Sequence, residues 1–201
     1  MSKILIAYNN DATTILHDFF ESCADEAKQI CMDNGIEFSS VCPPDLNEKE
    51  VIGNMCDHHI CVLAAHGDPN GLYNELGEAI ISTQTTNYNF KDKALYSMGC
   101  HCAQNLYPEL KKMGLLLFVG YNDTFNVRGD QTPFIACAME GLRSFLSGDD
   151  LKTAKEKMFR LFDEQISKFD KVDLWSAVEL AHNKEALIFE GEDSILLVNL
   201  Q

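Results

Sequence analysis

The stretch "HHICVLAAHG" at residues 58–67 decides the fold, because its middle, Ile60 to Ala65, is continuously apolar. A strand with no alternation of polar and apolar residues is covered on both faces, which is typical of a parallel sheet. His66 and Gly67 follow this run directly. The stretch therefore predicts a buried parallel strand with an imidazole at its carboxyl end.

Comparable runs recur along the chain, separated by segments with apolar residues at helical spacing. We predict strands over residues 3–8, 36–41, 58–65, 93–99 and 115–121, and helices over residues 13–34, 47–55, 102–114, 133–146, 151–169 and 174–183. This alternation predicts an α/β fold, a three-layer sandwich with a mainly parallel central sheet. We expect residues 1–201 to form a single domain.

Two segments fit this alternation less directly. Residues 66–79 are rich in turn formers and predict a loop or a small hairpin. Residues 185–200 hold two apolar runs around "EGEDS", which predict a terminal hairpin.

The formal net charge of −15 bears on the classes of partner that the chain can bind. It disfavours binding to nucleic acid and to anionic membranes, whose phosphates would be repelled. No apolar run approaches the roughly 18 to 20 residues that span a bilayer. The first ten residues, "MSKILIAYNN", have too short an apolar stretch for a secretory signal. We expect a cytoplasmic protein.

The chain has eight cysteines, which we expect to be reduced in that compartment. Most of them fall in apolar patterns, where a free cysteine packs as a small hydrophobic residue. No pair of Cys-x-x-Cys motifs is present, so a structural zinc site has little support. A metal site built from His66, Cys100, His101 and Cys102 is a weaker alternative, and we expect neither a metal nor an organic cofactor.

One cysteine lies where chemistry is expected. In open parallel sheets, ligands bind beyond the carboxyl ends of the strands. Cys100 follows the predicted strand 93–99, as His66 follows 58–65. If those strands are neighbours, the thiol and the imidazole face each other across one crevice. A thiolate is a nucleophile, the imidazole can relay its proton, and the N–H groups of Gly67 and Cys100 can stabilise an oxyanion.

At these residues the chain resembles a known family. "CVLAAHG" (61–67) and "ALYSMGCHC" (94–102) resemble the His-Gly and Cys motifs of the caspase-like cysteine peptidases of clan CD. The closest pattern is that of metacaspases and CHAT-type domains, and the Cys-His pair of the metacaspase nucleophile motif matches Cys100 and His101. "LYPELKKMGLLLFVGYND" (106–123) and "EALIFEGEDSILLV" (185–198) resemble the helix, strand and terminal hairpin of CHAT-like domains. The resemblance covers most of the chain in order and pattern.

The resemblance implies a caspase–haemoglobinase-like fold and a cysteine endopeptidase that forms an acyl-enzyme. It makes Cys100 the nucleophile and His66 the general base and acid. The amides of Gly67 and Cys100 become the oxyanion hole. The implied partner is a protein or peptide substrate, with a partner subunit or an activator left open.

The same resemblance implies a primary specificity pocket. It draws on the loop after the first strand and on the residue two before the nucleophile, which are Asp11 and Met98 here. Metacaspases carry an acid where this chain has Met98, so the basic preference of that group does not transfer directly. Asp123, after the strand 115–121, is a further acid near the expected mouth.

Several alternatives stay open at this point. Cys102 is a rival nucleophile, or a packing residue, or a redox partner of Cys100. His101 has no catalytic role in the family pattern. The whole chain could be an inactive caspase-like scaffold that binds a protein partner, or a small-molecule enzyme on a flavodoxin-like sheet that uses Cys100 as its nucleophile.

Overall fold

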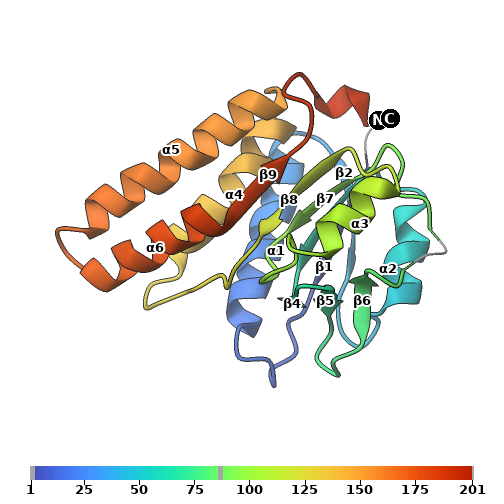
Figure 1. Ribbon diagram of the computed structural model, residues 1–201, viewed down its shortest axis with the longest axis horizontal. Helices are drawn as coiled ribbons and strands as arrows, with labels where there is room; N and C mark the ends of the chain where they lie inside the picture. The colour runs from blue at the N-terminus through green and yellow to red at the C-terminus, as the bar shows by residue number, and fades with distance from the viewer. Residues whose placement is uncertain (1–2, 86–87, 201) are drawn as a thin grey trace.

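The computed structural model describes residues 3–85 and 88–200 and has an α/β architecture around a six-stranded sheet (Figure 1). The strand order is β2-β1-β3-β7-β8-β9, and β9 alone runs antiparallel to its neighbour. The strands are β1 Lys3–Tyr8, β2 Glu37–Val41, β3 Ile60–Ala64, β7 Ala94–Ser97, β8 Leu117–Tyr121 and β9 Leu187–Glu190. The predicted mainly parallel central sheet is therefore confirmed.

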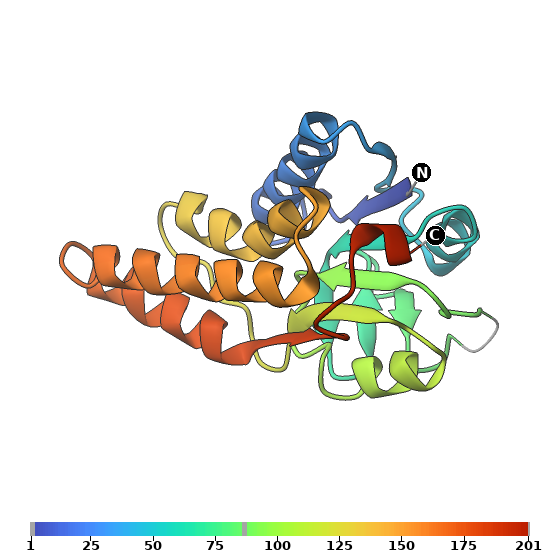
Figure 2. The same cartoon turned by 90° about the horizontal axis from the view of Figure 1, so that it is seen from above.

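Helices cover both faces of this sheet (Figures 1 and 2). They are α1 His17–Asp33, α2 Glu48–Met55, α3 Leu106–Lys112, α4 Thr132–Leu146, α5 Leu151–Phe169 and α6 Leu174–Ala186. On one face α1 and α4 pack together, α5 packs on α4, and α6 packs on α5; α2 and α3 lie on the other face. None of the helices in the described part of the chain is both long and apolar enough to cross a membrane.

The side chains of the central strands alternate between two hydrophobic clusters. In β1, Ile4 and Ile6 belong to the cluster with α1 and α4, while Leu5 and Ala7 belong to the cluster with α2 and α3. All five residues of β3 are buried. Because both faces are covered, the continuously apolar runs of the sequence are explained, and the three-layer arrangement is confirmed.

A second, antiparallel sheet branches off directly after β3. Its order is β4-β5-β6, formed by β4 His66–Asp68, β5 Gly71–Tyr73 and β6 Ala79–Ser82. The segment predicted as a loop or small hairpin is thus a hairpin extended by a third strand. This small sheet places His66 and Gly67 in a short strand rather than in an irregular loop.

Local sequence signals explain several element boundaries. The side chain of Asn47 accepts a hydrogen bond from the backbone N–H of Glu50 at 3.1 Å and caps α2. Gly35 lies two residues after the last residue of α1. Its φ is +63°, a left-handed conformation that glycine adopts without strain and that ends helices. Helix α3 begins later than predicted, because the residues after Cys100 bond to other loops: His101 N–H donates to the Asp123 carbonyl and Asn105 N–H to that of Pro69.

The predicted terminal hairpin is wrong. Strand β9 pairs with the free edge of β8, and the second apolar run forms only a short 3₁₀ helix, η1 Leu197–Asn199. The intervening chain crosses to the start of α5, where Ile195 and Asp193 carbonyls accept hydrogen bonds from the N–H groups of Leu151 and Lys152. The unpaired N–H groups of a helix start therefore bind this segment instead of a strand partner.

Candidate active site

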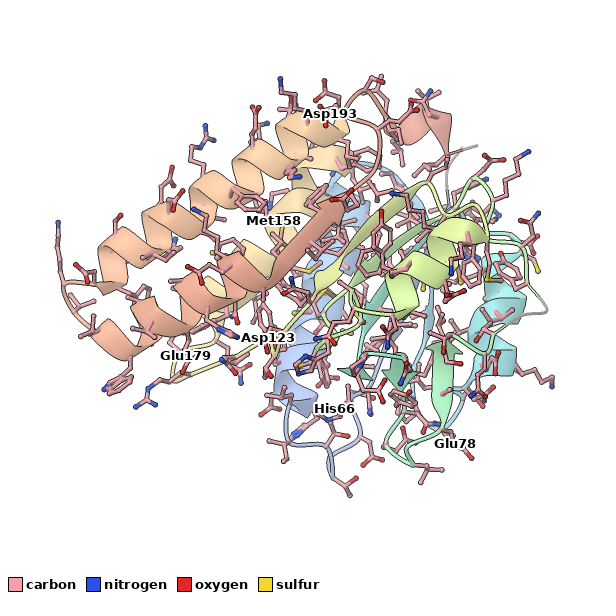
Figure 3. All side chains as sticks on the ribbon, viewed as in Figure 1. His66, Glu78, Asp123, Met158, Glu179 and Asp193 are labelled. Carbon is pink, nitrogen blue, oxygen red and sulfur yellow. The ribbon has the colours of Figure 1, made fainter. Side chains whose placement is uncertain are left out.

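The strands that precede His66 and Cys100 are neighbours in the sheet. Strands β3 and β7 pair in parallel, with Leu63 opposite Ser97. His66 lies three residues beyond Leu63, and Cys100 lies three residues beyond Ser97. The condition that the sequence left open is therefore met: both residues leave adjacent strands at the same edge of the sheet. In Figure 3, His66 lies at this edge, with Asp123 of the β8 end on the same side.

The backbones of the two segments touch at Gly67. A side-chain carbon added to Gly67 would lie 2.5 Å from the carbonyl oxygen of Cys100 and 3.0 Å from its nitrogen. No L-amino acid with a side chain fits this approach without moving backbone. Glycine therefore permits the close contact that puts His66 beside the Cys100 segment.

The imidazole of His66 is held by packing alone. It meets the ring of Phe20 edge-on, with ring centroids 5.2 Å apart. Within residues 3–85 and 88–200, neither ring nitrogen has a hydrogen-bond partner. Burial lowers the pKa of His66 below its ordinary value of 6.5, so the ring is neutral near pH 7 and able to accept a proton.

His58 illustrates the opposite case. It is only 9% exposed, and its two ring nitrogens contact the Ser39 hydroxyl and the Asn54 carbonyl, each at 2.6 Å. This is a structural histidine whose hydrogen-bonding capacity is used by the fold. The free nitrogens of His66 set it apart from such a role.

The thiol of Cys100 is half-buried and directed at a backbone donor. The N–H of Phe125 donates to Cys100 Sγ at 3.3 Å. Burial raises the pKa of the Cys100 thiol, the N–H groups of Phe125 and of Cys100 itself act in the opposite direction, and the Asp123 carboxylate adds to the rise. The resting group is thus a thiol whose ionised form already has hydrogen-bond donors in place.

The rival thiol, Cys102, lies in a different environment. It is completely buried, and its S–H donates to the carbonyl of Gly99 at 3.2 Å. Burial raises the pKa of Cys102 to about 11. A buried thiol with an engaged proton is a packing residue and not an accessible nucleophile. Cys100 is the more exposed of the two thiols.

His101 turns the chain sharply after the nucleophile candidate. Its φ is 55°, in the left-handed region that non-glycine residues rarely adopt. The ring lies between the Thr124 hydroxyl, 3.2 Å from Nε2, and the Gln104 amide, 3.2 Å from Nδ1. Its Nδ1 is also 3.9 Å from a carboxylate oxygen of Asp123. His101 therefore links the Cys100 turn to the loop after β8.

The three residues expected to contact substrate lie in different settings. Met98 is 2% exposed and belongs to the hydrophobic cluster between the sheet and helices α1 and α4. The Asp11 carboxylate accepts hydrogen bonds from the hydroxyl and the backbone N–H of Thr13, and both bonds lower the pKa of Asp11. The carboxylate is therefore bonded within a local turn. Asp123 is exposed beside His101. Substrate binding by these residues stays a prediction.

Sequence reasoning missed Phe125. Its role depends on a backbone N–H, which every residue except proline carries, so no residue type signals it. Its ring stacks on Phe19 of α1 at 5.2 Å between centroids, next to the Phe20 that contacts His66. Two adjacent residues of α1 therefore contact the His66 ring and the residue whose N–H donates to Cys100.

Other features lie apart from this site. Two cavities of about 530 Å³ each are lined by residues of α3 and the 190–199 segment, and by residues of α1 and α4. Neither includes His66 or Cys100. In the described part of the chain, no three His, Cys, Asp or Glu side chains gather closely enough to hold a metal ion.

No protein-family model matches the chain, and no curated protein matches it.

Proposed function

We propose that this chain is a cysteine peptidase of caspase-like type, which cleaves peptide bonds with Cys100 and His66. The observation that carries the proposal is that His66 and Cys100 follow the ends of two adjacent strands. β3 and β7 are parallel neighbours, and the His66–Gly67 segment lies against the Cys100 backbone. The mainly parallel sheet between helical layers agrees with the architecture that the sequence resemblance implies.

The proposed reaction begins with the transfer of the Cys100 proton to the neutral imidazole of His66. The sulfur attacks the substrate carbonyl carbon and forms a C–S bond. The negative charge on the carbonyl oxygen is stabilised by backbone N–H groups of Gly67 and Cys100. Each such donor typically contributes a factor of about 10²–10³ in rate.

The tetrahedral intermediate then collapses. The C–N bond breaks, and His66 gives its proton to the departing amine. Water, deprotonated by His66, attacks the thioester and releases the carboxylic acid together with the thiol. The N–H of Phe125 offsets part of the cost of forming the thiolate in the half-buried site.

The natural test is peptide cleavage by the purified chain. A mixed peptide library is incubated with the wild type, Cys100→Ala and His66→Ala, and new termini are identified by mass spectrometry. The proposal expects cleavage by the wild type alone, at a shared residue type. Cleavage that persists in Cys100→Ala would contradict it. Complete inactivity with every peptide would favour the non-catalytic scaffold.

A further inference from the structure

The loop after β8, residues 122–126, is held from its far side by α6. The N–H of Asn122 donates to the Ala186 carbonyl at 2.8 Å. A ring nitrogen of His182 contacts the Thr124 carbonyl at 2.9 Å. Alternate residues of the loop are thus bound to α6, while Phe125, between them, donates its N–H to Cys100.

Asn183 makes the most complete of these contacts. Its side-chain oxygen accepts from the N–H of Asn126 at 2.8 Å, and its amide nitrogen donates to the carbonyl of Asn126 at 2.7 Å. The Asn183 side chain is 0% exposed. A buried amide that bonds both the N–H and the carbonyl of one residue fixes the two peptide units that meet at that residue, including the one that links it to Phe125.

We propose that Asn183 is a positioning residue for the Cys100 thiol. Through its paired hydrogen bonds to Asn126 it holds the preceding N–H, that of Phe125, at Cys100 Sγ. Asn183 touches neither the sulfur nor a substrate. Its effect is transmitted through the backbone between Asn126 and Phe125. Helix α6 therefore acts on the Cys100 thiol through the loop and not by direct contact.

The chemical consequence is a lower cost of forming the thiolate. A hydrogen bond to a charged acceptor is stronger than the same bond to a neutral one, so the Phe125 N–H favours the ionised sulfur. Burial and the Asp123 carboxylate act against ionisation. The donor that Asn183 holds is one of two backbone N–H groups that oppose them.

The importance of this contact for catalysis rests on the proposed function, but its effect on the thiol does not. The test is therefore the pH dependence of alkylation at Cys100 by iodoacetamide. Peptide fragmentation separates the adducts of Cys100 from those of Cys102. The wild type is compared with Asn183→Ala over about pH 6–11, and urea unfolding verifies that each variant is folded.

The proposal expects the titration midpoint of Cys100 to rise by about one pH unit in Asn183→Ala, because the Phe125 donor is no longer held in place. Ser176→Ala is the matched control. Ser176 is another buried polar residue of α6, bonded to Asp173 and not to the loop, so its removal should leave the midpoint unchanged. A midpoint in Asn183→Ala equal to that of the wild type would overturn the proposal.

A second variant covers the case in which Asn183→Ala does not fold. Asn183→Leu fills nearly the same volume without the two hydrogen bonds, and the same rise in midpoint is expected. If the Cys100 midpoint shifts in the Asn183 variants but the wild type cuts no peptide, the positioning role is supported and the peptidase function is not. If the Cys100 midpoint does not shift in the Asn183 variants and the wild type cuts peptides, the positioning role is overturned and the proposed function is not.

Discussion

Gly67 and Cys100 are in backbone contact at the edge where β3 and β7 end: a carbon added to Gly67 would lie 2.5 Å from the Cys100 carbonyl oxygen. The residues come from segments more than thirty positions apart, "CVLAAHG" and "SMGCHC". Their contact gives the imidazole and the thiol a common location. It is also the feature that a single substitution tests most simply.

Gly67→Ala should destabilise the fold and suppress reaction at Cys100. The added methyl group meets backbone atoms, which cannot rotate away, so we expect a loss of about 1–3 kcal/mol in the free energy of unfolding. Urea unfolding and alkylation of Cys100 measure the two effects. Gly53→Ala is the control: it lies in α2 with nothing within 4 Å of the added carbon, and should stabilise by about 0.5–1 kcal/mol. Unchanged stability and reactivity in Gly67→Ala would contradict the contact.

His66 should make the protein less stable in mild acid. Burial lowers its pKa from the ordinary 6.5, so just below pH 6.5 the unfolded chain binds more protons than the folded one. Stability therefore falls as the pH drops through the window from 6.5 to the lower folded pKa, and is fully present above 6.5. Urea unfolding at several pH values should show a shallower decline for His66→Gln.

The decline will not vanish in that variant. Burial also lowers the pKa of His59, which contributes in the same direction. The combined His59→Gln and His66→Gln chain should decline least. Identical slopes for the wild type and His66→Gln would mean that the imidazole is not buried as described.

The cysteines should differ sharply in native reactivity. Cys56 is exposed and should alkylate readily, whereas Cys102 and Cys61 are 0% exposed and should react only after unfolding. Mass mapping after brief treatment with iodoacetamide, with and without urea, distinguishes the groups. Native modification of Cys102 at a rate comparable to that of Cys56 would show that the packing around Cys102 opens freely.

Asp123→Asn should lower the pKa of the Cys100 thiol, the opposite direction to Asn183→Ala. The Asp123 carboxylate disfavours the thiolate, and its charge is removed in this variant. Because Asp123 is 54% exposed, added salt should reduce the effect in the wild type. The pH profile of Cys100 alkylation at low and high salt measures both. A midpoint that moves upward would contradict the account.

The sequence predicts the parts of this site that depend on residue type. The apolar runs before His66 and Cys100 identify two buried strands, and the carboxyl ends of parallel strands lie at one edge of a sheet, so the two residues are expected to face each other if their strands are neighbours. Their adjacency itself depended on the strand order, which periodicity does not encode. β3 and β7 are neighbours in the central sheet, and the three strands between them in the chain, β4, β5 and β6, form a separate small sheet.

The remaining parts depend on backbone and on long-range contacts. No residue type signals the Phe125 N–H, and Asn183 looks like any other polar residue of a helix until its partner, Asn126, is placed beside it. The terminal hairpin failed for a related reason. Two apolar runs joined by a polar turn favour pairing locally, but the free edge of β8 and the start of α5 offered better partners.

The most direct test of the central claim is intact-protein mass spectrometry after brief treatment with peptidyl acyloxymethyl ketones that differ in the residue before the reactive group. Wild type, Cys100→Ala, Cys102→Ala and His66→Ala are treated side by side. We predict a single adduct in the wild type and Cys102→Ala, slower labelling in His66→Ala, and none in Cys100→Ala. An adduct that persists in Cys100→Ala and disappears in Cys102→Ala would contradict this prediction.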